Sequence, residues 1–147
     1  MKRIQYILTF ILPLLILCAC NSEDDIDEIF VGRTWYMNGI VINGVTNSKE
    51  TQNFYTDTDK NCYFISFSSG TFQGKLSSGV AFSGTWQADG KHQTIKLNLK
   101  EKPNPDNLFD KQILNILSST TSYTSGAEFM HLNDDKQNTI RFGTFRF

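Results

Sequence analysis

The chain has few of the residues that would cross-link it or build a metal or nucleic-acid site. Its 147 residues include three cysteines and two histidines, and 14 basic residues stand against 15 acidic ones. Without a basic excess, nucleic acid is not expected as a partner. The two histidines, His92 and His131, lie far apart without metal-ligand spacing, so no metal site is predicted.

The chain also lacks an apolar run long enough to cross a bilayer as a helix. Its charge-free stretch over residues 4–19 is broken by two polar residues and a proline, whereas a spanning helix needs about 20 apolar residues. The stretch follows two basic residues and ends in small ones, which is typical of a secretory signal peptide. Residues 1–19 are therefore predicted to be a cleaved lipoprotein signal peptide.

The segment Leu17-Cys18-Ala19-Cys20 resembles the bacterial lipobox, in which a branched apolar residue and a small residue precede a cysteine. In that family the cysteine receives diacylglycerol and becomes the first residue of the mature chain. The resemblance implies that Cys20 is lipidated, carries fatty acyl chains such as palmitate, and anchors the protein in a membrane. Several acyl chains hold better than one, because each buried methylene adds about 0.8 kcal/mol of membrane affinity.

An acidic run follows the predicted anchor. Residues 20–29 contain Glu23, Asp24, Asp25, Asp27 and Glu28. Such a run is predicted to be a solvated tether, because it cannot bury itself. It also resembles the export signal that some Gram-negative lineages place after a lipidated cysteine. That resemblance implies an outer-membrane lipoprotein at the cell surface, with the periplasmic face of the membrane as the alternative.

Little besides apolar burial is available to hold the mature domain together. Loss of residues 1–19 leaves 12 basic and 15 acidic residues, and Cys62 is then the one thiol not lipidated, so no intramolecular disulfide is expected. Twelve Phe, five Tyr and two Trp can supply the core, because aromatic side chains bury the most area each.

The alternation of apolar and polar residues predicts a β domain over residues 30–147. The clearest strand places Ile95, Leu97 and Leu99 on one face. The pair Asn43-Gly44 predicts a hairpin turn, and residues 45–61 a long loop with at most one short strand. Many short strands with glycine-rich turns predict a mainly β (α+β) fold, an antiparallel meander that forms a half-barrel or a small barrel with one packed helix.

The one predicted helix follows Asn104, which is expected to be its N-cap, with Pro105 at the first helical position. Its apolar stripe is Phe109, Ile113, Ile116 and Leu117. We expect the stripe to pack against the strands. The predicted core is Trp35, Phe67, Trp86, Leu97, Phe109, Ile113, Leu117, Leu132 and Phe142.

Three stretches resemble the META domain, a small β-rich domain of bacterial envelope lipoproteins. They are "VGRTWYMNGI", "FSSGTFQGKLSSGVAFSGTWQADG" and the helix with its following strands, together covering residues 30–142. The family often has a cysteine in its middle hairpin and another before the helix, and both are missing here. The resemblance implies binding or envelope maintenance without catalysis. The Gly-x-Trp in "GRTW" and "SGTW" also resembles lipocalins, which implies a carrier with an apolar barrel cavity.

The remaining motifs do not predict catalysis. The stretch from Asp57 begins like a calcium loop, but Cys62 and Ser68 stand where that loop needs glycine and glutamate. Cys62 is interpreted as a buried thiol. The sequence therefore predicts no catalytic, cofactor or metal residue. It predicts a lipid-anchored envelope lipoprotein with a non-catalytic binding or maintenance domain. The expected partners are the membrane and an envelope protein, a glycan or a small apolar ligand.

Overall fold

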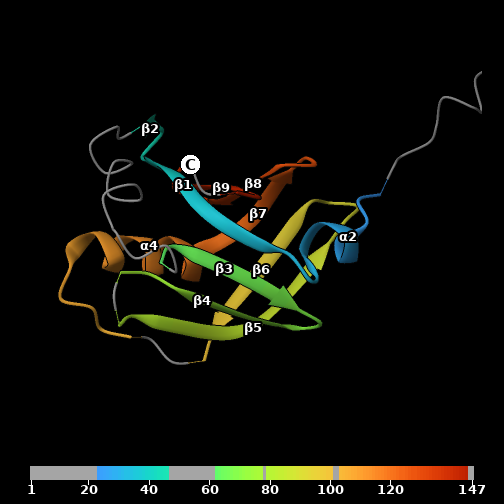
Figure 1. The fold of residues 1–147 in the computed structure, drawn as a ribbon. Coiled ribbons are helices and arrows are strands. Elements are labelled where there is room, and N and C mark those ends of the chain that lie inside the picture. Colours follow the sequence, from blue (N-terminus) through green and yellow to red (C-terminus); the bar gives the residue numbers. More distant parts are fainter. Residues whose placement is uncertain (1–22, 47–61, 78, 101–102, 146–147) are drawn as a thin grey trace, which may run out of the picture.

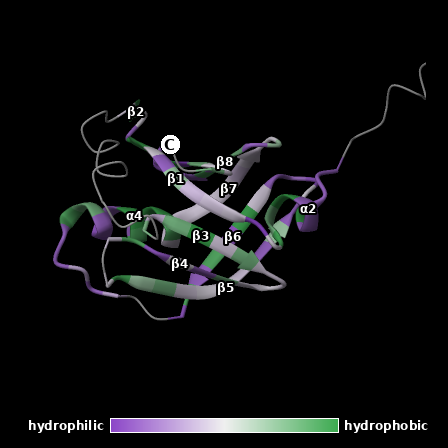
Figure 2. Ribbon diagram, viewed as in Figure 1, coloured by the Kyte–Doolittle hydropathy of each residue, from purple (hydrophilic) through white to green (hydrophobic). Residues whose placement is uncertain are grey.

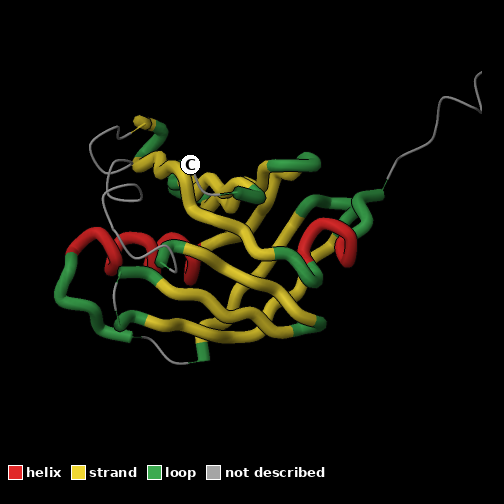
Figure 3. The backbone as a smooth tube through the Cα atoms, viewed as in Figure 1, coloured by secondary structure: helices red, strands yellow, loops and turns green. Residues whose placement is uncertain are grey.

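The computed structural model describes residues 23–46, 62–77, 79–100 and 103–145, and there the strands form one antiparallel sheet closed into a barrel (Figures 1 and 3). Strand β1 (Thr34–Ile42) pairs with β3 (Phe64–Ser68) on one side and β9 (Thr139–Gly143) on the other. This double pairing closes the barrel and confirms the predicted fold class. The remaining barrel strands are β4 (Thr71–Lys75), β5 (Ala81–Asp89), β6 (Thr94–Leu99), β7 (Thr120–Ser125) and β8 (Phe129–Asp134).

The predicted turn after β1 is confirmed. Asn43 and Gly44 have φ angles of 50° and 77°, the left-handed pair that a tight two-residue hairpin needs. They lead into β2 (Val45–Thr46), a short extra strand paired with β1. The residues around Asp57, the rest of the predicted long loop and the signal segment with Cys20 lie outside the described part of the chain.

The predicted helix is present as α4 (Leu108–Ser119), at one end of the barrel (Figure 1). Its apolar stripe is buried as expected. The predicted N-cap is wrong: Asn107, not Asn104, accepts a hydrogen bond from the Phe109 backbone N–H at 2.9 Å. Pro105 lies buried in the preceding loop, so its fixed φ shapes the approach to the helix instead of opening it.

A second helix, α2 (Ile26–Phe30), lies at the opposite end of the barrel (Figure 1). Asp25 caps it by accepting a hydrogen bond from the Glu28 backbone N–H at 3.1 Å. Phe30 is fully buried at its end. The sequence did not predict this helix: within the segment 20–29, predicted as an acidic tether, Ile26 and Ile29 pack on the core, while Asp25, Asp27 and Glu28 are exposed.

The barrel interior holds one continuous cluster of buried apolar side chains. Every residue of the predicted core belongs to it. Figure 2 shows the alternation of hydrophobic and hydrophilic residues along the strands that places this cluster inside. A shift of register between Met37 and Gly39 interrupts the alternation in β1, so Ile40 and Val41 are both buried while Ile42 is only half-buried.

Candidate functional site

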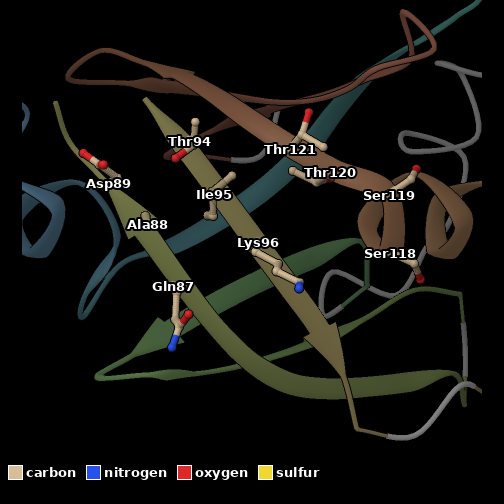
Figure 4. Close-up of a pocket in the computed structure, with 10 residues that line it drawn as sticks. All are labelled: Gln87, Ala88, Asp89, Thr94, Ile95, Lys96, Ser118, Ser119, Thr120 and Thr121. Carbon is tan, nitrogen blue, oxygen red and sulfur yellow. The ribbon is translucent and has the colours of Figure 1, made fainter. Parts of the chain in front are cut away.

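A groove opens on the outside of the barrel where β6 and β7 separate. β6 pairs with β5 at six register positions, from Thr94 to Leu99. On its other side β6 pairs with β7 at Thr94 alone, opposite Ser122. The end of α4 and the start of β7 stand across this opening (Figure 4). Within the described residues, β6 therefore has no strand partner on that side beyond Thr94.

The groove has a volume of about 600 Å³ and a lining of mixed polar and apolar groups. Opposite charges, Asp89 and Lys96, stand on the β5 and β6 wall, and hydroxyl groups dominate the α4 and β7 wall. The lining residues, labelled in Figure 4, are Gln87, Ala88, Asp89, Thr94, Ile95, Lys96, Ser118, Ser119, Thr120 and Thr121. Such a surface offers donors and acceptors to a ligand, together with apolar contact from residues such as Ala88 and Ile95.

The helix-end wall of the groove is held in place by its own hydrogen bonds. The hydroxyls of Ser118 and Thr120 donate to the carbonyls of Leu114 and Ile116, at 2.7 and 2.9 Å. Ser119 donates to the Asp134 carboxylate at 3.1 Å, which ties α4 to the end of β8. The wall is thus a fixed surface, and α4 passes directly into β7 at Thr120.

An Asp–His pair lies in the turn at one end of the groove. His92 Nδ1 is 2.7 Å from the Asp89 carboxylate, and both side chains are largely exposed. The hydrogen bond with Asp89 raises the pKa of His92, and the same bond lowers the pKa of Asp89. The pKa of the other histidine, His131 on β8, is lowered. Burial is the larger cause, and the nearby charge of Arg141 is the second.

A buried polar cluster lies near the start of α4. Asp110 is fully buried. Its carboxyl accepts hydrogen bonds from the hydroxyl of Tyr63, at 3.2 Å, and from that of Ser77. Cys62, beside Tyr63 in the chain, is also buried, as the sequence predicts. The cluster joins α4 to the start of β3 and to the loop after β4, which makes it a structural tie.

The sequence-predicted residues fall in separate places. Cys62 precedes β3, His131 lies on β8, and His92 lies in the β5–β6 turn. Within the described ranges, no three His, Cys, Asp or Glu residues gather closely enough to hold a metal ion. None of the described helices has the length and apolar character needed to cross a membrane. The sequence did not predict the groove, because its polar residues occupy positions that are ordinary for the solvent-facing side of each strand.

The closed antiparallel sheet, the continuous apolar core inside it and the two helices at its ends together define a small β-barrel domain. The chain belongs to the DUF4847 family, described as a domain of unknown function, whose model matches residues 21–146. The family match does not report a META domain, so the META resemblance remains a prediction. Among curated proteins there is no match.

Among the solved structures that resemble the chain are the following two. A DUF4847 family protein from Bacteroides vulgatus ATCC 8482 has a TM-score of 0.68 at 22% identity, over 83% of this chain and 99% of its own. A protein solved by NMR has a TM-score of 0.50 at 18% identity, over 78% of this chain and 91% of its own. At these sequence identities, both similarities show a shared fold and nothing about function.

Proposed function

We propose that this protein is a lipid-anchored envelope lipoprotein whose β-barrel is a non-catalytic binding module. Cys20 is the anchor, and the membrane is the outer membrane, with the domain at the cell surface. The groove between β6 and the α4–β7 junction is the binding surface. Its ligand is a polar segment of another envelope molecule, a protein or a glycan.

The observation that carries the proposal is the contrast between the inside and the outside of the barrel. Inside, buried side chains form a continuous core. Outside, a groove that carries charged and hydroxyl side chains borders a strand whose edge is open beyond Thr94. An open strand edge offers backbone donors and acceptors to an extended segment. The proposal therefore places binding on the surface and assigns the interior to stability.

Two observations support the anchor. The lipobox-like segment ends at Cys20, and the family match begins at residue 21. The region shared by the family thus starts where the signal segment is predicted to end. Lipid attachment would hold the barrel at the membrane without a spanning helix.

A non-catalytic role also fits the chemistry of the titratable groups. The Asp89–His92 pair is exposed, and solvent screens it. The buried Asp110 is bonded to hydroxyls that join structural elements. General acid–base catalysis needs such groups beside a place where substrate can sit out of water. The Asp89–His92 pair borders the groove, but it does so at a site that is open to water, and Asp110 is held by its hydroxyl partners inside the fold.

The alternative, a lipocalin-like carrier of a small apolar ligand, is favoured by one feature. The Trp35 indole N–H is buried in the core with no acceptor among the described residues, so an acceptor atom on a mainly apolar ligand would satisfy it. An apolar ligand would compete with the core for the same space, however, and the aromatic rings around Phe30 and Phe67 lie within contact of one another. Surface binding therefore remains the preferred function.

The anchor is tested by replacing Cys20 with alanine in the full chain. We expect the wild type to incorporate labelled fatty acid and to fractionate with membranes. The Cys20→Ala variant should lose both properties or accumulate with its signal segment attached. The control is Cys18→Ala, which leaves the proposed acceptor in place and should still be labelled. A wild-type protein without acyl chains would contradict the anchor.

The groove is tested by photo-crosslinking in native envelopes. A photoreactive amino acid at Lys96, on the groove wall, should give a discrete crosslinked product. The same amino acid at Thr71, exposed on β4, should not. Adding Thr94→Arg, which fills the groove, should remove the product at Lys96. Equal crosslinking at Lys96 and Thr71, or a product unaffected by Thr94→Arg, would rule out the groove as the binding surface.

A further inference from the structure

The chain is attached to the barrel almost immediately after the proposed anchor. The Asp24 carboxylate accepts hydrogen bonds from the Tyr123 hydroxyl at 3.0 Å and the Gln93 amide at 3.2 Å. The Asp24 backbone N–H donates to the Gly90 carbonyl at 3.3 Å. Burial, followed by the bond with Asp24, raises the pKa of Tyr123. Asp24 is therefore joined to β5–β6 and β7 at one end of the barrel.

Two further contacts fix this attachment. A side chain at Gly90 would place its Cβ 2.2 Å from the Asp24 carbonyl oxygen, so the close approach depends on glycine. Past Asp24, the ring of Phe30 packs against Phe67, Trp86 and Tyr123, with ring centroids 5.0 to 5.1 Å apart. The N-terminal segment is thus part of the folded barrel from Asp24 onward.

The length of chain between Cys20 and Asp24 limits how the barrel can stand on a membrane. Four residues reach about 14 Å at full extension. A compact sphere of 100 residues is roughly 34 Å across, more than twice that reach. An anchor at Cys20 therefore keeps the end of the barrel that carries Asp24 near the lipid. The opposite end of the barrel cannot be the end nearest the membrane.

We propose that the α2 end of the barrel is held against the lipid headgroups of the membrane that carries the Cys20 anchor, with the α4 end pointing away. This inference rests on the lipid anchor of the proposed function. The β3–β4 turn belongs to the same end, because the Gly32 N–H donates to the Phe67 carbonyl at 3.0 Å. Figure 1 shows α4 at the other end.

The charge of the α2 end sets the kind of contact. Glu23, Asp25, Asp27 and Glu28 are exposed there. Ionised carboxylates are costly to move out of water, so this end lies on the hydrated headgroup layer and does not enter the hydrocarbon. The groove then starts on the membrane side, at Asp89 and Thr94, and runs toward α4. A ligand of the groove would therefore bind close to the membrane surface.

Headgroup quenching tests the orientation. Full-length lipidated protein carrying Ser69→Cys or Lys136→Cys is labelled with an environment-sensitive fluorophore. Ser69 is exposed in the β3–β4 turn and Lys136 in the β8–β9 turn near α4, while Cys62 is buried and protected from labelling. The protein is reconstituted into phosphatidylethanolamine–phosphatidylglycerol vesicles with headgroup nitroxides. We expect several-fold stronger quenching at position 69 than at position 136.

The matched control inserts twenty Gly/Ser residues between Ser22 and Glu23, which adds a mean span of roughly 25 Å. The difference between the two positions should then largely disappear. If the lipidated wild type floats with the vesicles but both positions are quenched equally, or position 136 more, the orientation is wrong. If the protein does not float with the vesicles, the anchor itself is wrong. The two failures are therefore distinguishable.

Discussion

Replacing Phe30 with alanine is expected to lower the free energy of unfolding by about 3–5 kcal/mol, the usual cost of deleting a fully buried Phe ring. Phe30 has no exposed surface, and its ring contacts Phe67, Trp86 and Tyr123. Domains are stable by about 5–15 kcal/mol in total. A five-residue helix close to the proposed lipid anchor would thus contribute a large share of the stability of the barrel.

Urea unfolding of a soluble form that starts at Asn21 measures the effect. The midpoint should fall strongly, and the melting temperature should fall by roughly 10–20 °C. The control is Asp27→Ala, an exposed position in the same helix, which should change stability by about 0.5 kcal/mol at most. A loss below about 1 kcal/mol for Phe30→Ala would mean that α2 is not part of the cooperative barrel.

Replacing Asp110 with alanine is expected to lower the free energy of unfolding by about 2–4 kcal/mol. The change leaves the Tyr63 hydroxyl without its acceptor in a buried site, which costs about 1–3 kcal/mol. It also removes an acidic residue from the first turn of α4, where such residues stabilise a helix by about 0.3–1 kcal/mol. The lost contact with Ser77 adds to both terms.

Two variants separate these contributions in the same unfolding experiment. Asp110→Asn keeps the size and one acceptor oxygen, so it should lose clearly less stability than alanine. Asp106→Ala changes an exposed acid just before the helix and should have an effect within about 0.5 kcal/mol. Equal losses for Asp110→Ala and Asp106→Ala would show that the cluster does not tie α4 to the barrel.

The barrel was predictable from the sequence because its strands follow local rules. Alternation placed Ile95 and Leu97 inside, and helix spacing placed Ile113 and Leu117 inside. These patterns need no knowledge of distant residues. The double pairing of β1 follows from no local pattern, and the sequence left half-barrel and barrel as alternatives.

Helix α2 was missed although signals for it exist. The acids suggested solvation, yet Asp25 and Glu28 have the spacing of a capping pair. Ile26, Ile29 and Phe30 fall at the i, i+3 and i+4 positions of one helix face. The hydrogen bonds of Asp24 could not be foreseen, because their partners lie far along the chain, Gln93 in the turn before β6 and Tyr123 in β7.

The candidate site was hidden for the same reason. Lys96 and Thr121 come from strands whose separation appears only in the folded sheet. Asp110 looked like an ordinary acid at a helix start, and its burial depends on Tyr63, 47 residues away. Tertiary partners decide such roles, whereas periodicity reports only which face of an element is buried.

The closure of the barrel through β1 and β9 has a consequence for how the chain folds. Tyr36 pairs with Gly143 and Val41 with Thr139, so the closing contacts join the two ends of the domain. Folding slows as contacts become more distant in sequence, and small β-barrels typically need milliseconds to seconds. β1 has its full set of neighbours only after the last strand has been made and has paired with it. Until then its open edge is a site for pairing with another chain, so correct folding depends on protecting that edge.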